Sequence, residues 1–480
     1  MFVTAANQRI SLTINLFIFM RLYGLLALFL ASMVLFTGCS SESTYPVESY
    51  VHGTLKVRAE VDSTGNYEGF RITVLTQKLG EVDTLGTAVT DKAGAFSMVV
   101  HAPEKGIYPI VVERSGTNLS VDDIVLSSGD SIQVTGAYPL GARGLRIIST
   151  ENAAWSAYRN AKAGHNQQMV GLLKGEGYST DDLKRINAQT STILWSIPST
   201  YPGTIGGNLS MAESVVMMEG WSDSTVIARY EQIPLDNQSI VEVVRAARRS
   251  VSRAVGLDSA IALIDHYIAI IPESKRPGLM AEKVIAYADS MMNPEAIRTA
   301  TELKKAYPES EWADWAGRAT YELENLQPGM IAPAIKLVNR DGEEISTATV
   351  KGKFVILEFF DPSEQIYQRE FESRNGIAAA LDDRAFQYIS ISVEPDSVIN
   401  EALFDEENRP GHFVWLGTGM DAKVVKDFNV QILPTRFLLD PQGQIMAKYS
   451  GPSVANLEQD LASIVTGLNG LVPEPADNEN

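Results

Sequence analysis

The spacing of apolar residues changes twice along this chain, and each spacing admits few folds. From Val51 to about residue 140, apolar and polar residues alternate, as they do at Phe70, Ile72 and Val74. Alternation with a period of two predicts strands that bury one face. Turn sequences such as DKAG and SSGD separate these segments. We therefore expect a small antiparallel β-sandwich over residues 50–145.

Residues 150–326 have a helical pattern, with apolar residues three and four positions apart. Pro-Glu-Ser occurs at 272–274 and again at 308–310, each time between two helical segments. The second copy and its flanks resemble a tetratricopeptide repeat, so we predict an all-α region with tetratricopeptide-like pieces. Two copies do not make a solenoid, which needs three or more units. A helical spacer and a peptide-binding groove both remain open for this region.

Two smaller features of the helical region have structural interpretations. The basic sequence RAARRS, which ends at Ser250, is interpreted as a solvated helix face. Trp312 and Trp315 are three positions apart, so we expect them to take part in helix packing rather than to bind carbohydrate.

Over residues 327–468 strand and helix patterns alternate, which indicates an α/β domain. Residues 354–360 (FVILEFF) are nearly continuously apolar, as expected for a strand buried on both faces of a sheet.

Two groups of motifs in this part resemble the thioredoxin superfamily, in its branch of membrane-tethered thiol–disulfide reductases and peroxiredoxin-like proteins. The first group is Gly329, Ala332-Pro333, Asp341-Gly342, Lys351-Gly352-Lys353 and the strand at 354–360. The second is Leu433-Pro434-Thr435, which resembles the segment that carries the cis-proline of that fold. The resemblance implies a cis Leu433–Pro434 bond and places Pro434 close to Glu364 and Tyr367. It also implies that the surface beside Pro434 is a candidate peptide groove.

The chain departs from the family at the redox site. Relatives carry Cys-x-x-Cys where the first strand passes into a helix, and here Glu364 and Tyr367 occupy the two cysteine positions. Thiol–disulfide exchange needs a thiolate to attack and a second thiol to resolve the mixed disulfide, so neither residue supports it. Asp361 and Glu364 have the spacing of a capping box, with Pro362 at the first helical position. We therefore predict a well-capped helix there; the alternative is a repurposed polar pocket beside Pro434.

The sole cysteine of the 480 residues is Cys39. It follows Gly38 and an apolar run at 22–37 that begins after Arg21. A basic residue, a short apolar stretch and a small residue are typical of a secretory signal. The sequence FTGC resembles the bacterial lipobox, which implies that the thiol is acylated. Met20 stands directly before Arg21 and is interpreted as the true start.

These features predict a signal peptide over residues 1–38, a lipidated tether over 39–49 and an acidic tail over 469–480. The alternative for the apolar run is an uncleaved anchor helix. Either places the remainder outside the cytoplasm, as an envelope lipoprotein anchored to a membrane and facing the periplasm or the cell surface.

The composition of the chain limits the classes of ligand and partner that it is expected to bind. The formal net charge is −19, which argues against nucleic acid because phosphate binding needs a basic surface. The five histidines show no local ligand pairing, so we expect neither metal nor cofactor. His412 is interpreted as a surface or packing residue.

Two classes of function follow. The favoured hypothesis is a redox-inactive envelope lipoprotein that binds a peptide or protein partner. The alternatives are a thiol–disulfide oxidoreductase by fold relationship only, and an enzyme that uses an unrecognised non-thiol site.

Overall fold

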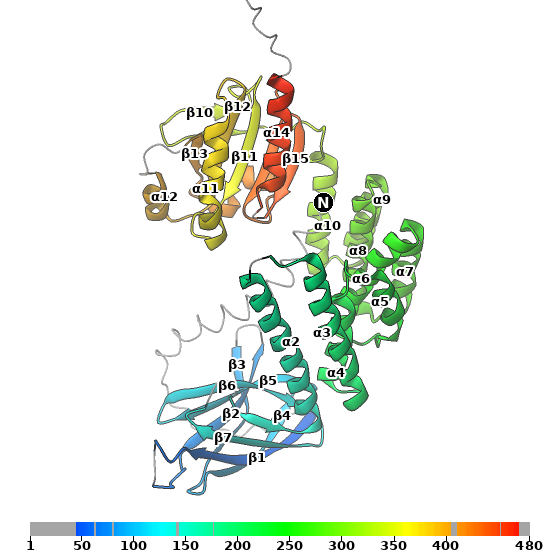
Figure 1. The fold of residues 1–480 in the computed structure, drawn as a ribbon, viewed down its shortest axis with the longest axis vertical. Helices are drawn as coiled ribbons and strands as arrows, with labels where there is room; N and C mark the ends of the chain where they lie inside the picture. The colour runs from blue at the N-terminus through cyan, green and yellow to red at the C-terminus, as the bar shows by residue number, and fades with distance from the viewer. Residues whose placement is uncertain are drawn as a thin grey trace, which may run out of the picture. The chain divides into compact units, whose positions relative to one another are not determined.

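The computed structural model describes residues 45–61, 64–78, 81–140, 144–175, 177–404, 410–451 and 453–469 (Figure 1). The chain forms two compact units that divide between Leu279 and Met280, and each is described by itself. The expected signal peptide, Cys39 and the end of the acidic tail lie outside the described residues. No helix in the described ranges is long and apolar enough to span a membrane.

Among the described residues of the first unit, eight strands form two four-stranded sheets with the orders β4-β1-β7-β8 and β3-β2-β5-β6. The strands are β1 (Val47–Val57), β2 (Phe70–Lys78), β3 (Glu81–Val89), β4 (Ala95–Ala102), β5 (Gly106–Arg114), β6 (Thr117–Leu126), β7 (Asp130–Tyr138) and β8 (Arg146–Ile148). Both sheets contribute to one core, in which Val51, Ile72, Ile110 and Ile132 are fully buried. The period-two pattern therefore identified the buried face of these strands.

The predicted sandwich was antiparallel, and this is wrong for one pairing. Val51 in β1 lies opposite Met98 of antiparallel β4, but also opposite Ile132 of β7, which runs parallel to β1. The chain leaves the first sheet after β4, passes through β5 and β6 of the other sheet, and re-enters beside β1 in the same direction.

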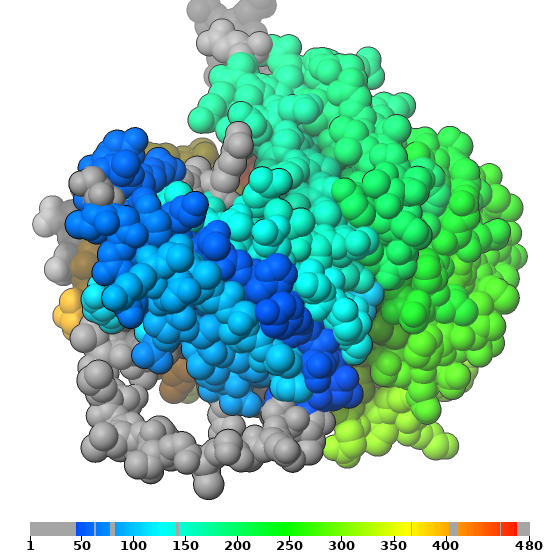
Figure 2. Space-filling view, turned by 90° about the horizontal axis from the view of Figure 1, so that it is seen from below, coloured from blue at the N-terminus to red at the C-terminus, as the bar shows by residue number. Residues whose placement is uncertain are grey.

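The rest of the first unit is helical. Its helices are α2 (Thr150–Lys174), α3 (Thr180–Thr200), α4 (Ile205–Val216), α5 (Asp223–Arg229), α6 (Ile240–Ala254), α7 (Leu257–Ile270) and the short 3-10 helices η1 (Tyr230–Gln232) and η2 (Glu273–Lys275). Asn152 of α2 ties the helices to the strands, because its amide donates to the Val125 carbonyl oxygen at 2.9 Å and accepts from the Val125 N–H at 2.8 Å. Figure 2 shows the surface of the strands, blue to cyan, continuing into that of these helices.

The basic segment of α6 is not the solvated face that its charges suggested. Arg248 is 4% exposed and Ser250 is fully buried. Arg249 donates to Glu219 at 2.5 Å, and the side chains of this pair are also mostly buried. The helix is packed on this face, and the acidic partner of Arg249 lies on another segment, which local sequence could not reveal.

The second unit begins with a helical part. Its helices are α8 (Arg276–Asp289), which starts in the first unit, α9 (Asn293–Ala306) and α10 (Glu311–Asn325). Ala300, Leu303 and Ala316 share a core between α9 and α10. Trp312 and Trp315 pack edge to face beside this core, with ring centroids 5.9 Å apart. Each Pro-Glu-Ser does lie between two helices, while the tetratricopeptide-like assignment stays a prediction.

An α/β domain completes the second unit (Figure 1). Its central sheet has the order β13-β12-β11-β14-β15, and β9 and β10 form a separate hairpin. The strands are β9 (Lys336–Val338), β10 (Glu344–Ser346), β11 (Phe354–Phe360), β12 (Phe386–Ser392), β13 (His412–Trp415), β14 (Thr435–Leu439) and β15 (Ile445–Ser450). The helices are α11 (Gln365–Ala380), α12 (Ser397–Phe404), α13 (Lys423–Asp427), α14 (Ala455–Asn469) and the 3-10 helix η3 (Gly419–Asp421).

The central strand β11 is buried on both faces, as its apolar run predicts. Leu357 and Phe359 belong to the core on one face of the sheet. Ile356 belongs to the core on the other face, together with Leu457 of α14 and Ala378 of α11. Strand β11 pairs in parallel with β12 and antiparallel with β14, so its carboxyl end meets the start of β14.

Candidate functional site

The candidate site lies where β11 ends at Phe360 and the chain turns into α11. The predicted capping box is wrong: α11 begins at Gln365, with Glu364 as its N-cap residue and no side-chain capping hydrogen bond. Asp361 instead accepts hydrogen bonds at Oδ1 from the backbone N–H of Ser363 at 2.8 Å and from its hydroxyl at 2.7 Å. The Glu364 N–H donates to the Asp361 carbonyl oxygen at 3.2 Å, which closes a β-turn before the helix. Asp followed by Pro favours such a turn as readily as a helix start, because Asp bonds nearby backbone and Pro fixes φ.

Tyr367, in the second cysteine position, is part of the core. Its side chain is 3% exposed and stacks on Phe360, with ring centroids 4.3 Å apart. Phe371 lies edge-on to it at 6.0 Å, and Phe413 completes the cluster. The position of the resolving thiol is therefore filled by a packed aromatic ring.

The segment around Pro434 lies at the same edge of the sheet. Thr435 is paired with Phe359 of β11, so Pro434 stands beside the end of that strand. The Leu433–Pro434 peptide bond is cis, in agreement with the sequence-based expectation. The Pro434 carbonyl oxygen accepts from the Gly451 N–H at 2.9 Å. That Pro434 approaches Glu364 and Tyr367 closely stays a prediction.

The side chains of the predicted groove face inward. Leu433 is 8% exposed and Thr435 is 1% exposed. The Thr435 hydroxyl donates to the Ile432 carbonyl oxygen at 2.6 Å. A peptide bound along this edge would therefore meet backbone more than these side chains.

Next to this edge, one residue further along the β11–β14 pair, is a buried ionic cluster that the sequence did not predict. Glu358, in the middle of β11, is fully buried and accepts a hydrogen bond from Arg436 Nε of β14 at 2.9 Å. Arg374 of α11, also fully buried, donates to the other carboxylate oxygen of Glu358. Arg436 further contacts Glu370 of α11 at 3.3 Å. The cluster joins β11, α11 and β14, the three elements that contain or directly flank the two cysteine positions and the cis-proline.

Burial and charge oppose each other at Glu358. Burial would raise the pKa of this carboxyl, but the attraction of Arg374 and Arg436 outweighs it, and the pKa is lowered. At Glu370 burial dominates over the attraction of Arg436, and the pKa is raised. Glu358 therefore stays ionised at neutral pH, between two buried guanidinium groups. The one feature of the sequence that could have indicated this cluster is Glu358, a single acidic residue within the apolar run FVILEFF.

Aromatic rings surround the Arg374 guanidinium. Its central carbon lies 5.0 Å from the ring centroid of Phe413 and 5.1 Å from that of Tyr388. Phe360 and Tyr367 lie at 5.9 Å. Contacts of this kind stabilise a desolvated cation, so the aromatic residue at position 367 also supports the buried charge.

His412 is the remaining candidate in the C-terminal domain. His412 is hydrogen-bonded to Gln387 and, at 3.1 Å, to Asn339, consistent with a packing role. No group of three or more His, Cys, Asp or Glu that could hold a metal ion occurs among the described residues.

The helical part of the first unit contains a cavity of about 810 Å³ beside η1 and α7. Tyr230, Leu263 and Tyr267 line it. Peptide binding by the helical region stays one of the two alternatives for this part of the chain.

Comparison with known proteins identifies the C-terminal fold. Residues 328–448 match the model of the AhpC/TSA family. The C-terminal part of the chain is a thioredoxin-superfamily domain. The thiol-disulfide oxidoreductase ResA of Bacillus subtilis (strain 168) is 24% identical to this chain over 142 residues, which cover 30% of this chain and 78% of that protein.

Two solved structures are also similar to the thioredoxin-like domain. The thioredoxin domain of a thiol-disulfide oxidoreductase from Bacteroides vulgatus is 23% identical, with 28% of this chain and 99% of that one covered and a TM-score of 0.26. A thiol-disulfide oxidoreductase from Bacteroides fragilis is 24% identical, with 27% and 98% covered and a TM-score of 0.24.

These comparisons bear on the two hypotheses differently. They support a relationship to thiol–disulfide oxidoreductases, which the sequence offered as an alternative, more directly than they support a redox-inactive binding protein. The relationship is one of fold, and function rests on the residues of the site.

Proposed function

We propose that this chain is an envelope lipoprotein whose thioredoxin-like domain binds an extended peptide or protein partner without exchanging disulfides. The observation that carries the proposal is the replacement of both redox positions, by Glu364 and by the packed ring of Tyr367. Disulfide exchange proceeds through thiolate attack on sulfur, and no cysteine occurs after Cys39. If Cys39 is acylated, the mature protein has no free thiol.

What this chain retains supports binding. The cis Leu433–Pro434 junction is present at the edge of the sheet where β11 ends. The ionic cluster of Glu358, Arg374 and Arg436 is placed to hold β14 against β11 at this edge. An extended peptide can add to a fixed backbone edge through main-chain hydrogen bonds, which require no thiol.

The second candidate function is the thiol–disulfide oxidoreductase activity of the relatives, which the comparisons favour. This activity would require a thiol at or near position 364 or 367. The two candidate functions differ in one measurable property. A binding domain retains its partner in the presence of a thiol-blocking reagent, whereas a thiol exchanger is trapped or inactivated by it.

Site-specific photo-crosslinking tests the proposed edge. A benzophenone side chain placed at Gln431, which is exposed and three residues before Pro434, should give a discrete adduct in native membranes. The matched control is the same group at Lys351, which is exposed and precedes β11 at the opposite end of that strand. The adduct should be lost in a Pro434→Ala background and persist after thiol blocking. Equal adducts from both positions, or none from Gln431, would contradict peptide binding at this edge.

A further inference from the structure

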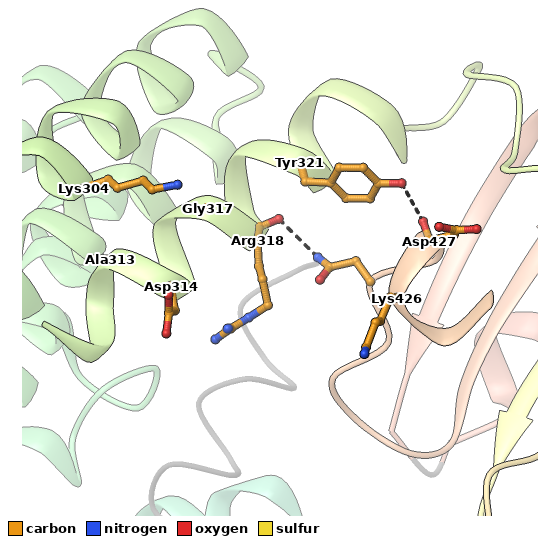
Figure 3. Close-up of a pocket in the computed structure, with 9 residues that line it drawn as sticks. Lys304, Ala313, Asp314, Gly317, Arg318, Tyr321, Lys426 and Asp427 are labelled. Atoms are coloured by element: carbon orange, nitrogen blue, oxygen red, sulfur yellow. Dashed lines mark hydrogen bonds between the residues drawn. The ribbon is translucent and has the colours of Figure 1, made fainter. Parts of the chain in front are cut away.

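A second, separate hollow lies between α10 and the end of α13, in the second unit (Figure 3). Its volume is about 400 Å³, and three cationic side chains line it: Lys304 of α9, Arg318 of α10 and Lys426 of α13. The lining also has two carboxylates, Asp314 and Asp427, so its formal charge is weakly positive. The chain as a whole is acidic, with 40 basic against 59 acidic residues.

Two of these cations are exposed and have no counter-ion among the described residues. Neither Lys304 nor the guanidinium of Arg318 has an ion-pair or hydrogen-bond partner in the part of the chain that the structure describes. Lys426 contacts Asp421 at 3.0 Å, but both side chains are largely exposed. An exposed pair of this kind is weak and readily exchanges its partner for a ligand.

Gly317 opens the floor of the hollow. It lies in the interior of α10, where glycine is unfavourable because of its backbone entropy. A Cβ at this position would meet only Lys304 Nζ, at 3.6 Å, which is ordinary van der Waals contact. Close packing of the backbone therefore does not require glycine here. With no side chain at Gly317, the space beside Lys304 Nζ is left unfilled on this side.

Hydrogen bonds between α10 and the segment at and after the end of α13 hold the walls of the hollow. Asn429 is 6% exposed and donates to the Arg318 carbonyl oxygen at 3.2 Å and to Glu322 at 2.6 Å. The Tyr321 hydroxyl donates to the Asp427 carbonyl oxygen at 2.9 Å, as Figure 3 shows. A hollow held in this way loses little conformational entropy when a ligand binds.

The two carboxylates of the lining differ. Asp427 is paired with Lys423, outside the hollow. Asp314, one turn before Arg318, has no partner among the described residues and can accept hydrogen bonds from a ligand.

We propose that this hollow binds a small organic anion, a carboxylate or phosphate that also carries hydroxyl or ammonium donors. The anionic group lies among Lys304, Arg318 and Lys426, and the donors face Asp314. The site is independent of the edge beside Pro434, so either proposal can fail alone.

Calorimetric titration of the chain from residue 40 onward tests this, in dilute phosphate-free buffer. The probes are ribose 5-phosphate, glutamate and inorganic phosphate, with neutral ribose as a control. We expect ribose 5-phosphate or glutamate to bind with a dissociation constant of about 1 mM or below, and ribose not to bind. The two probes distinguish a phosphate from a carboxylate ligand.

Variants locate the binding. Lys304→Gln combined with Arg318→Gln should weaken binding at least about fivefold, as expected when charged contacts are removed. Lys305→Gln, the neighbouring exposed lysine outside the lining, should leave it unchanged. Gly317→Gln should block the hollow, and Asp314→Asn should weaken the donor-bearing probe more than inorganic phosphate. Thermal unfolding of each variant checks that it is folded.

Three results would overturn the proposal. They are failure of every probe to bind the wild type, binding that survives the double variant, and equal loss in Lys305→Gln.

Discussion

Replacing Glu358 with glutamine would remove the one carboxylate that both buried arginines share. Arg374 and Arg436 are each at most 1% exposed, so neither can recover its hydration when the charge is lost. Arg436 keeps a contact with Glu370 at 3.3 Å, whereas Arg374 loses its only carboxylate partner in the described structure. Each arginine bonds a different oxygen of Glu358, and glutamine replaces one of these oxygens with an NH2 donor, so one arginine would face a donor in place of its acceptor.

The expected cost is therefore that of breaking a buried ion pair, about 3–5 kcal/mol of unfolding free energy. A domain of this size has a total stability of about 5–15 kcal/mol, so the loss would be a large part of it. The matched control is Glu370→Gln, since Glu370 is partly exposed and its contact is longer. It should cost about 1 kcal/mol or less.

Hydrogen exchange measured by mass spectrometry isolates this domain within the full chain. In Glu358→Gln, peptides from β11 and β14 should lose protection, while peptides from the N-terminal sheets should not. If the variant costs less than about 1 kcal/mol, or if Glu370→Gln costs as much, the cluster does not hold these strands together.

The same residue sets a pH dependence. The folded pKa of Glu358 is lowered, so its contribution is complete above its unfolded pKa of about 4.3 and is lost as the pH falls through the lowered value. The wild-type domain should lose stability on acidification below about pH 4, and Glu358→Gln should lose less. An equal loss in both would assign the acid sensitivity to other groups.

Three further predictions concern the anchor, the redox site and the hollow. Metabolic labelling with a fatty acid should mark the wild type and not Cys39→Ala; equal labelling would exclude lipidation at this cysteine. In an insulin-reduction assay, purified residues 40–480 should show only the background rate, because neither Glu364 nor Tyr367 can form a disulfide; turnover that persists through repurification would refute redox inactivity. Gly317→Ala should stabilise α10 by about 0.5–1 kcal/mol, since a Cβ there meets only Lys304 Nζ at 3.6 Å; destabilisation on thermal or urea unfolding would mean that the glycine is needed for packing.

Local patterns in the sequence were enough for the order and class of the parts. Periodicity depends only on neighbouring residues, so alternation identified the buried face at Phe70, Ile72 and Val74, and the apolar run identified β11. The lack of thiols at positions 364 and 367 is likewise read directly from the residues.

Where local signals compete, the tertiary structure decided. Asp361-Pro362 suits both a helix start and a turn, and the backbone of the chain forms the turn, with α11 beginning at Gln365. The parallel pairing of β1 with β7 depends on how the chain crosses between two sheets, which no local pattern encodes.

The charged features were beyond sequence reasoning for the same reason. Glu358 pairs with Arg374 sixteen positions away and with Arg436 seventy-eight positions away. Lys304, Arg318 and Lys426 line one hollow from three separate helices. The free energy of a charge depends on its burial and on its distance from other charges, and both are set only when distant segments pack together.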